Sequence, residues 1–483
     1  MTMKPTNGTP LTLSGLRHEI VGIDTKVPLL DGSERRYVFL DNAASTPTFR
    51  SVLKCVEDFM PWYSGVHRGT GFKAVVATNV YDQAHRLAGE FVGADLGNNV
   101  VLFGKNTTEC INILAYRFQF KPNDVVVSTS VEHHSNDLPW RKHCTVIHVG
   151  INTDGSINLQ ELRDALKVYK GRVRLVAVSG ASNVTGICSP IHEIAAWAHA
   201  DGAKIFVDVA QLAPHRRIDI LSNNNPQHID FVAYSAHKMY APFGIGVLVG
   251  PRKFFEDGEP NLVGGGTVSY VGLDEVEWAS PPQKDEAGSP NVVGAVALAE
   301  ALTMLRAVGM DTIARHEQNL LEYAIPRMKK INGLRLYGPT EDVSGKVGVI
   351  PFTIDGMDHA LVATILSVEG GVGVRNGNFC AQPYMRKLLG VSAKEEKEKR
   401  AARCDNPALP GMVRASFGCY TNEEDITIFL EALEKIARRQ YRGTYTVDPV
   451  TGMYRAKGYS VDASKHFHFF NPAGEPVASE EVA

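Results

Sequence analysis

The chain has 483 residues, of which 44% are hydrophobic and 21% are charged, and its formal net charge is -3. This length and composition are typical of a globular enzyme with more than one domain. The small net charge gives no reason to expect nucleic acid or an anionic membrane as a partner, and no apolar run is long enough to span a bilayer.

The first 36 residues are mixed and polar, and they lack the apolar stretch of a secretion signal. We expect them to form an N-terminal arm with a short helix at its end. The chain contains 7 cysteines, which form no Cys-x-x-Cys pair and no zinc spacing. These features predict a cytoplasmic protein with free thiols and without a bound metal.

From residue 37 to about residue 300, short apolar strands alternate with amphipathic helices. This alternation predicts an α/β domain whose mostly parallel sheet is covered by helices on both faces. The predicted strands are residues 37–40, 99–103, 124–128, 145–149, 173–178, 204–211 and 228–234, and the predicted helices are 49–62, 75–92, 110–118, 159–169 and 190–199. Ligands of such sheets bind beyond the carboxyl ends of the strands. The candidate functional side chains follow strands in this way: Thr108, His133, Asn183, Asp208 and Lys238.

Two of these strand ends offer an alternative interpretation. Thr107 and Thr108 at the start of a helix would suit a phosphate, because free N–H groups and the positive helix end favour an anion there. They would equally suit an ordinary threonine helix cap. His133 and His134, followed by Trp140, could stack on a flat cofactor or simply pack a loop.

Long helices predicted at 292–308 and 312–330 lead into a smaller second domain. The resulting division is an arm (1–36), a large domain (37–300), a small α+β domain (301–440) and a C-terminal extension (441–483). Strands are predicted near 334–337, 346–352, 371–375 and 412–417, with helices at 357–369 and 422–439. The charged run 392–403 predicts a solvated helix without chemistry, and residues 465–470 predict an edge strand rather than a metal site.

Asp208 and Lys238 are the most informative pair. Lys238 directly follows a buried strand, where scarce water lowers an ammonium pKa and allows a Schiff base with an aldehyde cofactor such as pyridoxal phosphate (PLP). An isolated lysine in such a loop would more often be a surface residue. Asp208 ends an apolar strand and needs a cationic partner, which the protonated ring nitrogen of PLP supplies. Around the pair lie residues suited to the ring oxygen and the phosphate: Gln211, Thr107, Thr108, Ser235 and His237.

With these residues in place, the chain resembles the class V aminotransferase family of PLP enzymes, which have the fold type I of PLP-dependent transferases. Within the family it is similar to cysteine desulfurases of the SufS/CsdA type. The resemblance runs from about residue 37 to 438 and rests on the segments 40–45, 67–69, 107–109, 132–136, 182–186, 207–211, 235–238, 287–291, 374–375, 380–383 and 414–416.

The resemblance implies a role for each matching residue. Lys238 would bind the cofactor and move protons, His133 would stack on the ring and Asp208 would pair with the ring nitrogen. Gln211 and Asn183 would act near the ring oxygen and the substrate, whereas Arg414 and Arg375 would hold the substrate carboxylate. The phosphate would be bound by Thr107, Thr108, Ser235 and His237. Ser289 would reach the phosphate of a partner subunit, which implies a homodimer.

Cys380 occupies the position of the desulfurase nucleophile. The implied reaction converts L-cysteine to L-alanine, leaves a persulfide on Cys380 and supplies an acceptor protein, for example in iron–sulfur cluster assembly. On its own, Cys380 would be interpreted as a small buried hydrophobe. Phe379 stands where the known relatives have His or Gln, and the spacing from Cys380 to Arg414 is longer than in those relatives.

Other functions remain open at this stage. Another class V PLP enzyme, such as a selenocysteine lyase, a C–S lyase or a transaminase, would carry most of the same residues, with Cys380 not acting as a nucleophile. A dinucleotide-binding dehydrogenase has little support, because no strand–Gly-x-Gly-x-x-Gly–helix unit is present. A non-catalytic scaffold is disfavoured by the presence of both Lys238 and Asp208.

Overall fold

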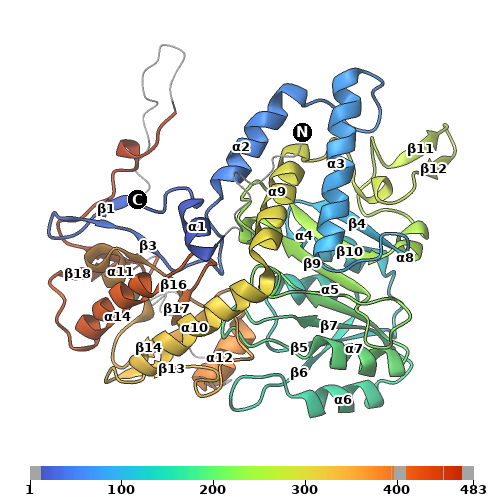
Figure 1. Cartoon of the computed structure of the whole chain (residues 1–483). Helices are drawn as coiled ribbons and strands as arrows, with labels where there is room; N and C mark the ends of the chain where they lie inside the picture. The colour runs from blue at the N-terminus through green and yellow to red at the C-terminus, as the bar shows by residue number, and fades with distance from the viewer. Residues whose placement is uncertain (1–11, 393, 396–409, 450, 470–483) are drawn as a thin grey trace.

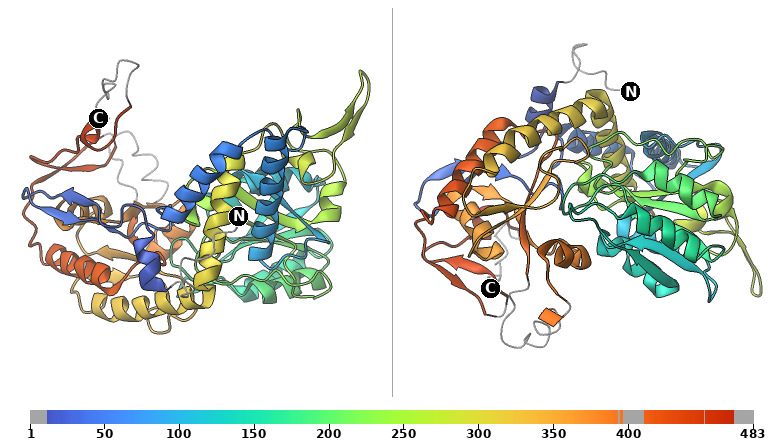
Figure 2. Two further views of the ribbon diagram at one scale, coloured as in Figure 1. Left: turned by 45° about the horizontal axis from the view of Figure 1, so that its top comes forward. Right: turned by 90° about the horizontal axis from the view of Figure 1, so that it is seen from below.

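The computed structural model describes residues 12–392, 394–395, 410–449 and 451–469, which form a large and a small lobe (Figures 1 and 2). A seven-stranded sheet lies at the centre of the large lobe. Its strands in spatial order are β4 (Asn99–Gly104), β10 (Gly246–Pro251), β9 (Phe231–Ser235), β8 (Lys204–Asp208), β7 (Val173–Ser179), β5 (Val125–Thr129) and β6 (Thr145–Val149). Only β10 runs against its neighbours among these strands, so the predicted mostly parallel sheet is confirmed.

Each central strand buries side chains on both of its faces, which explains why these strands are continuously apolar. In β9, Val232 and Tyr234 face one core, whereas Phe231 and Ala233 face the other. The first core is covered by α3 (Phe72–Phe91), α6 (Leu159–Val168), α7 (Ile191–Ala200) and α9 (Val292–Val308), with α2 (Arg50–Phe59) beside α9. The second is covered by α4 (Thr107–Arg117), α5 (Leu138–His143) and α8 (Arg252–Glu256).

Short elements complete the large lobe. A hairpin of β11 (Val268–Val271) and β12 (Val276–Trp278), which the sequence patterns did not predict, projects from the lobe (Figure 1). Single 3₁₀ turns occur at Met60–Trp62, His134–Asn136, Ala236–Lys238 and Gln283–Asp285. Among the described residues no single helix has the length and hydropathy to cross a membrane, although α9 and α10 (Met310–Met328) taken together, bent by 73°, would meet that test.

The small lobe contains an antiparallel sheet in the order β13 (Leu334–Leu336), β14 (Val349–Ile354), β17 (Met412–Ser416) and β16 (Arg375–Gly377). Its helices are α10 (Met310–Met328), α11 (His359–Gly370), α12 (Gln382–Leu389) and α14 (Glu423–Ala437). The short strand β3 (Val38–Phe39) pairs with β15 (Val372–Gly373), and Val38 and Leu40 are buried in the core of this lobe. The chain therefore enters the large lobe after Leu40, and the start of the region predicted as the large domain packs in the small lobe.

The N-terminal segment differs from the predicted arm with a helix at its end. Its helix, α1 (Leu13–His18), comes first and is capped by Thr12, and the segment ends in a hairpin of β1 (Lys26–Pro28) and β2 (Glu34–Arg36). The turn forms because Gly32 adopts a φ of 80° and the Asp31 carboxylate accepts a hydrogen bond from the backbone of Ser33.

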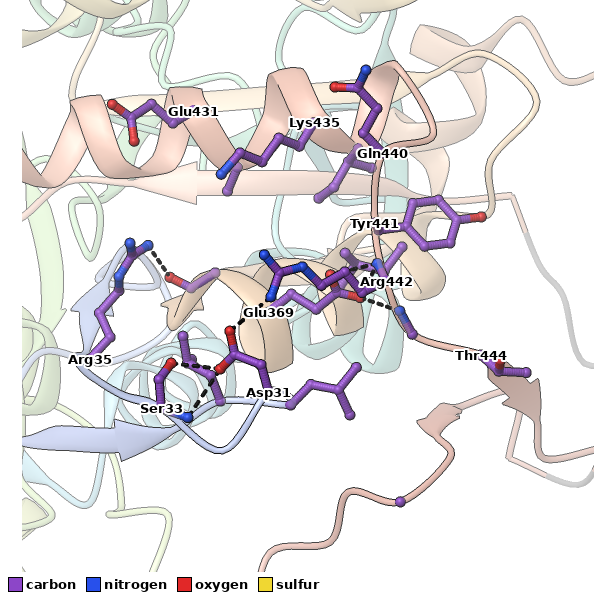
Figure 3. Close-up of a pocket in the computed structure, with 18 of the residues that line it drawn as sticks. Asp31, Ser33, Arg35, Glu369, Glu431, Lys435, Gln440, Tyr441, Arg442 and Thr444 are labelled. Carbon is purple, nitrogen blue, oxygen red and sulfur yellow. Dashed lines mark hydrogen bonds and ion pairs between the residues drawn. The ribbon is translucent and has the colours of Figure 1, made fainter.

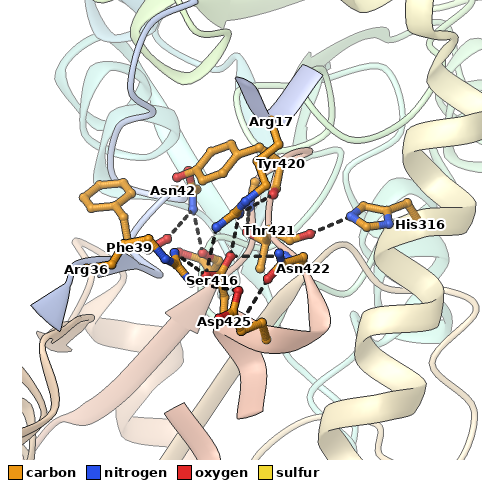
Figure 4. A network of polar contacts seen from close by, with 12 residues as sticks. Arg17, Arg36, Phe39, Asn42, His316, Ser416, Tyr420, Thr421, Asn422 and Asp425 are labelled. Carbon is orange, nitrogen blue, oxygen red and sulfur yellow. Dashed lines mark hydrogen bonds and ion pairs between the residues drawn. The ribbon is translucent and has the colours of Figure 1, made fainter. Parts of the chain in front are cut away.

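Asp425 fixes this segment to the small lobe (Figure 4). Its carboxylate binds Arg17 at 2.7 Å and Arg36 at 2.8 Å, and it also closes a capping box with Asn422 at the start of α14. One carboxylate thus bridges two arginines from the N-terminal segment and holds them on a helix more than 380 residues later in the chain.

The C-terminal extension is attached through Glu369 at the end of α11 (Figure 3). This carboxylate accepts hydrogen bonds from the backbone N–H groups of Arg442 and Gly443, each at 2.9 Å, and from the Tyr445 hydroxyl at 2.6 Å. A hairpin of β18 (Tyr445–Val447) and β19 (Tyr454–Ala456) follows. The predicted edge strand at 465–470 is wrong over its described part, where a 3₁₀ turn (Ala463–Lys465) precedes irregular chain. Most of the charged run 392–403 lies outside the described residues.

A network of ion pairs lies at the amino ends of β8 and β9, at the opposite edge of the sheet from Asp208 and Lys238. Asp230, just before β9, accepts from Lys204 Nζ at 2.7 Å and from the Ile205 N–H at 2.9 Å, and its Oδ2 lies 2.9 Å from Nε2 of His199. His228 lies beside them, so the group has the spacing of a metal site. Because Lys204 already pairs with the carboxylate, we interpret the group as a structural ion pair.

This network predicts that stability depends on pH. Burial opposes the charged imidazolium, but hydrogen bonds to Asp230 and Pro226 outweigh burial and raise the pKa of His199. A raised folded pKa contributes stability below the unfolded value of about 6.5, and that contribution is lost as the pH rises through the folded pKa. We expect the urea midpoint to fall above about pH 6.5, and His199→Gln to flatten this dependence. His192→Gln on the same helix is the control; an unchanged pH dependence in His199→Gln would contradict the interpretation.

Candidate active site

A cavity of about 510 Å³ lies at the carboxyl ends of the strands and is lined by residues of both lobes. All but one of the candidate site residues from the sequence line it: Thr107, Thr108, His133, Asn183, Asp208, Gln211, Ser235, His237, Lys238, Arg375, Cys380 and Arg414. They come from the ends of different strands and from the small lobe, so only the assembled fold brings them together.

The start of α4 forms one wall of this cavity. Asn106 is the helix cap, which corrects the alternative of a threonine cap and leaves both threonines in the first turn. Thr107 contacts the Ser235 hydroxyl through its own hydroxyl at 2.6 Å and its N–H at 2.7 Å. Gly246 on β10 permits this approach, because a Cβ there would lie 2.3 Å from the Asn106 backbone. Hydroxyls and free N–H groups at a helix N-terminus form a suitable seat for a phosphate.

His133 is held in one tautomer by Ser135. The Ser135 N–H donates to Nδ1 of His133 at 3.1 Å. The Ser135 hydroxyl lies 3.0 Å from the same Nδ1 and 2.7 Å from the Thr108 hydroxyl. Burial, reinforced by the nearby charge of Lys238, lowers the pKa of His133 to about 3. The imidazole is therefore neutral at physiological pH, and Nδ1 is an acceptor, so its proton is on Nε2. Ser135 was named only within a motif, and its link to Thr108 is visible only in the structure.

Asp208 and Lys238 share the cavity. Asp208 is buried at the end of β8, and the N–H of Ala210 donates to its Oδ1 at 2.9 Å. Burial raises the pKa of Asp208, although Ala210 and Lys238 oppose the shift. Burial lowers the pKa of Lys238 to about 8, against the opposing effect of Asp208. Lys238 thus has the lowered pKa that the sequence predicted for a lysine at a strand end.

Gln211 follows Asp208 and carries an unsatisfied atom. Its side-chain nitrogen donates to the Ala43 carbonyl at 2.6 Å, whereas its buried Oε1 has no hydrogen-bond partner in the described part of the chain. A buried amide oxygen without a partner is unusual in a folded protein and often marks a position completed by a ligand.

Two arginines on neighbouring strands form the opposite wall. Arg375 on β16 and Arg414 on β17 are register partners, and Asp41 binds both, at 2.8 Å and 3.1 Å. Arg414 also donates to the Asn183 carbonyl at 2.9 Å, while its buried Nε has no partner among the described residues. The sequence analysis included Asp41 in a motif of the family but assigned it no role. A charged residue at the start of a turn of small residues was the feature that could have indicated one.

Cys380 lies in a loop that is fixed by the large lobe. Phe379 and Cys380 both adopt left-handed backbone conformations, with φ of 50° and 52°, which cost energy for residues other than glycine. Asn183 donates to the Phe379 carbonyl at 2.7 Å, and the His134 N–H donates to the Cys380 carbonyl at 2.7 Å. Cys380 is exposed, so its interpretation as a buried hydrophobe does not hold. The ring of Phe379 covers the Arg414 guanidinium at 4.8 Å.

Ser289 does not reach this cavity. It lines another cavity, of about 810 Å³, together with Tyr63, His67, Arg68 and Gly266. Within one chain, therefore, the structure separates Ser289 from the residues with which the sequence grouped it.

A comparison with models of known protein families identifies the family of this chain. The family model described as "Aminotransferase class-V" matches residues 38–429. The chain belongs to the class V aminotransferase family. The resemblance inferred from the motifs is therefore confirmed, and the cavity between the lobes is the candidate active site of a family member.

Curated relatives of this class V aminotransferase have consistent names. A probable cysteine desulfurase of Halalkalibacterium halodurans is 35% identical over 407 residues, covering 82% of this chain and 92% of the relative. A cysteine desulfurase of Haloferax volcanii is 33% identical over 406 residues, covering 82% of this chain and 88% of the relative.

Solved structures agree with this family assignment. The apo cysteine desulfurase of Thermococcus onnurineus superimposes with a TM-score of 0.74 at 30% identity, covering 83% of this chain and 95% of that one. The cysteine desulfurase CsdA of Escherichia coli gives a TM-score of 0.73 at 27% identity, covering 89% of this chain and 99% of that one.

Proposed function

We propose that this class V aminotransferase is a PLP-dependent cysteine desulfurase, which converts L-cysteine to L-alanine and retains the sulfur as a persulfide on Cys380. The observation that carries the proposal is the exposed Cys380 at the wall of the cavity that also contains Lys238, Asp208 and Arg414. The names of the relatives support the same activity.

The cavity residues fit PLP. Asp208 offers a buried carboxylate to a protonated ring nitrogen, and Gln211, which lines the same cavity, would contact the ring oxygen. Thr107, Thr108, Ser235 and His237 would hold the phosphate, Lys238 would hold the aldehyde carbon, and His133 would stack on the ring. When bound, PLP supplies an electron sink that stabilises negative charge next to the substrate amine.

The protein side chains supply the remaining steps. Because its pKa is about 8 instead of about 10.4, Lys238 has a much larger fraction of free amine at neutral pH and can accept the α-proton. Arg414 and Arg375 orient the substrate carboxylate. The Cys380 thiolate attacks the substrate sulfur, the substrate Cβ–S bond breaks, and the sulfur remains on Cys380 as a persulfide. The Cβ atom gains a proton, and the product leaves as alanine.

The proposal extends to a homodimer. Ser289 does not line the active-site cavity of its own chain, and it shares another cavity with Tyr63, a large side chain that is 47% exposed. Covering such side chains with a second copy would bury apolar surface and bring Ser289 toward the partner's phosphate.

The fate of the sulfur is also part of the proposal. An exposed persulfide on Cys380 suits transfer to an acceptor protein, for example in iron–sulfur cluster assembly. The six described cysteines are all unpaired, which suits a reducing compartment such as the cytoplasm. L-selenocysteine is the alternative substrate, because the same residues would bind its carboxylate and amine.

Mass spectrometry of Cys380 after incubation with L-cysteine tests the proposed function. We expect the peptide that contains Cys380 to gain one sulfur atom, and we expect a thiol reductant to remove it. A peptide that stays unmodified while sulfide and pyruvate form would favour a C–S lyase, because β-elimination expels the sulfur and leaves a keto acid. A keto acid formed without sulfur release would favour a transaminase.

A further inference from the structure

We infer that Asp41 is a specificity-determining residue, which sets the charge of the carboxylate subsite so that it suits amino acids with one negative charge. This inference rests on the proposed function, because it concerns the substrate carboxylate that Arg414 and Arg375 would bind. Asp41 does not line the cavity; it acts through the two arginines that do.

The backbone around Asp41 is fixed where the chain passes from the small to the large lobe. Asp41 forms an isolated bridge with Ser416 at the end of β17. The Asn42 side chain and the Ala43 N–H then donate to Ser416, at 3.0 Å and 2.9 Å. The Asp41 carboxylate is consequently held in one place, with its side chain 13% exposed.

Each Asp41 oxygen binds a different arginine. Oδ1 lies 3.1 Å from Nη2 of Arg414, and Oδ2 lies 2.8 Å from Nη2 of Arg375. The two arginines occupy opposite positions on paired strands, where two like charges repel each other. One shared carboxylate removes this repulsion and turns both guanidinium groups toward the same side.

The charges at this subsite then leave a single positive charge for the substrate. Two guanidinium groups and one carboxylate sum to +1, which matches one α-carboxylate. Nε of Arg414 has no hydrogen-bond partner in the described part of the chain although the side chain is only 3% exposed, and it marks a position that a carboxylate would complete. A second negative charge on the substrate would find no third arginine among the described residues that line this cavity, and burying an unpaired charge is unfavourable.

Changing the charge of the subsite in both directions tests the inference. Asp41→Asn keeps the shape and raises the local charge to +2, whereas Arg375→Gln, at a half-exposed position, lowers it to zero. We expect the ratio of L-aspartate to L-alanine affinity, measured by calorimetry on the cofactor-loaded protein, to rise about tenfold in Asp41→Asn, equivalent to 1.4 kcal/mol. The same ratio should fall below the wild-type value in Arg375→Gln.

Asp425→Asn is the matched control, because Asp425 also bridges two arginines but lies away from the cavity. It should leave the ratio unchanged. If Asp41 were only structural, Asp41→Asn would weaken both amino acids by the same factor and the ratios would be equal in all proteins, which would overturn the inference. If Asp41→Asn did not fold, a ratio in Arg375→Gln equal to the wild-type value would still overturn it.

The two proposals fail separately. A wild-type protein that forms no persulfide from L-cysteine but shows the expected order of affinity ratios would refute the desulfurase function and leave the role of Asp41 intact. A persulfide on Cys380 together with the same ratio of L-aspartate to L-alanine affinity in the wild type and both variants would support the desulfurase function and refute the role of Asp41.

Discussion

Lys238→Ala is expected to abolish L-alanine formation, lowering the rate by roughly 10²–10⁴-fold or more, because it removes both the cofactor attachment and the proton acceptor. The pKa of Lys238 is about 8 because the side chain is buried at the cavity wall. An exposed lysine would have a smaller fraction of free amine and could not replace it. We also expect the visible absorbance of the wild-type protein to be lost or shifted. Borohydride reduction followed by peptide mapping should place the cofactor on Lys238 in the wild type.

Lys346→Met is a demanding control for this prediction. Lys346 is also buried, and burial lowers its pKa to about 8, but it does not line the cavity. The variant should retain both the visible absorbance and the labelled Lys238 peptide. Reduction that labels Lys346 instead, or full activity in Lys238→Ala, would contradict the assigned role of Lys238.

Cys380→Ala should lower L-alanine formation from L-cysteine by about 10²-fold or more, because Cys380 is the one thiol among the described residues that line the cavity. The cofactor absorbance should remain unchanged, since Lys238 and Asp208, which would hold the cofactor, are both retained in this variant. The comparison therefore separates loss of sulfur transfer from loss of cofactor binding.

Cys144→Ala provides the matched control for the thiol. Cys144 is half-buried, burial raises its pKa to about 11, and it lies outside the cavity. Its replacement should leave the rate unchanged. If Cys380→Ala released L-alanine at the wild-type rate, the chain would be a class V enzyme in which Cys380 is not the nucleophile.

The sequence was sufficient for the features that depend on local patterning. The continuous apolar runs of β5 and β9 predicted buried parallel strands, because a strand covered on both faces has no polar side. Asp208 and Lys238 were predicted as a pair because Asp208 ends one such strand and Lys238 follows the next, and parallel strands end at one edge of the sheet. The wrong strand at 465–470 and the misplaced helix of the arm are also local, and weak periodicity misled both predictions.

The order of residues was enough to predict the α/β architecture, the family and most of the residues that line the cavity. The three-dimensional packing sets how charges from distant segments combine, because a sequence pattern carries no distance between Asp41, Arg375 and Arg414. It also decided that Ser135 fixes the tautomer of His133, that Ser289 belongs to another cavity, and that residues 38–40 pack in the small lobe. These features depend on tertiary contacts between residues far apart in the chain. The free energy of folding that comes from such contacts depends on which side chains pack together, and a local sequence pattern does not contain that information.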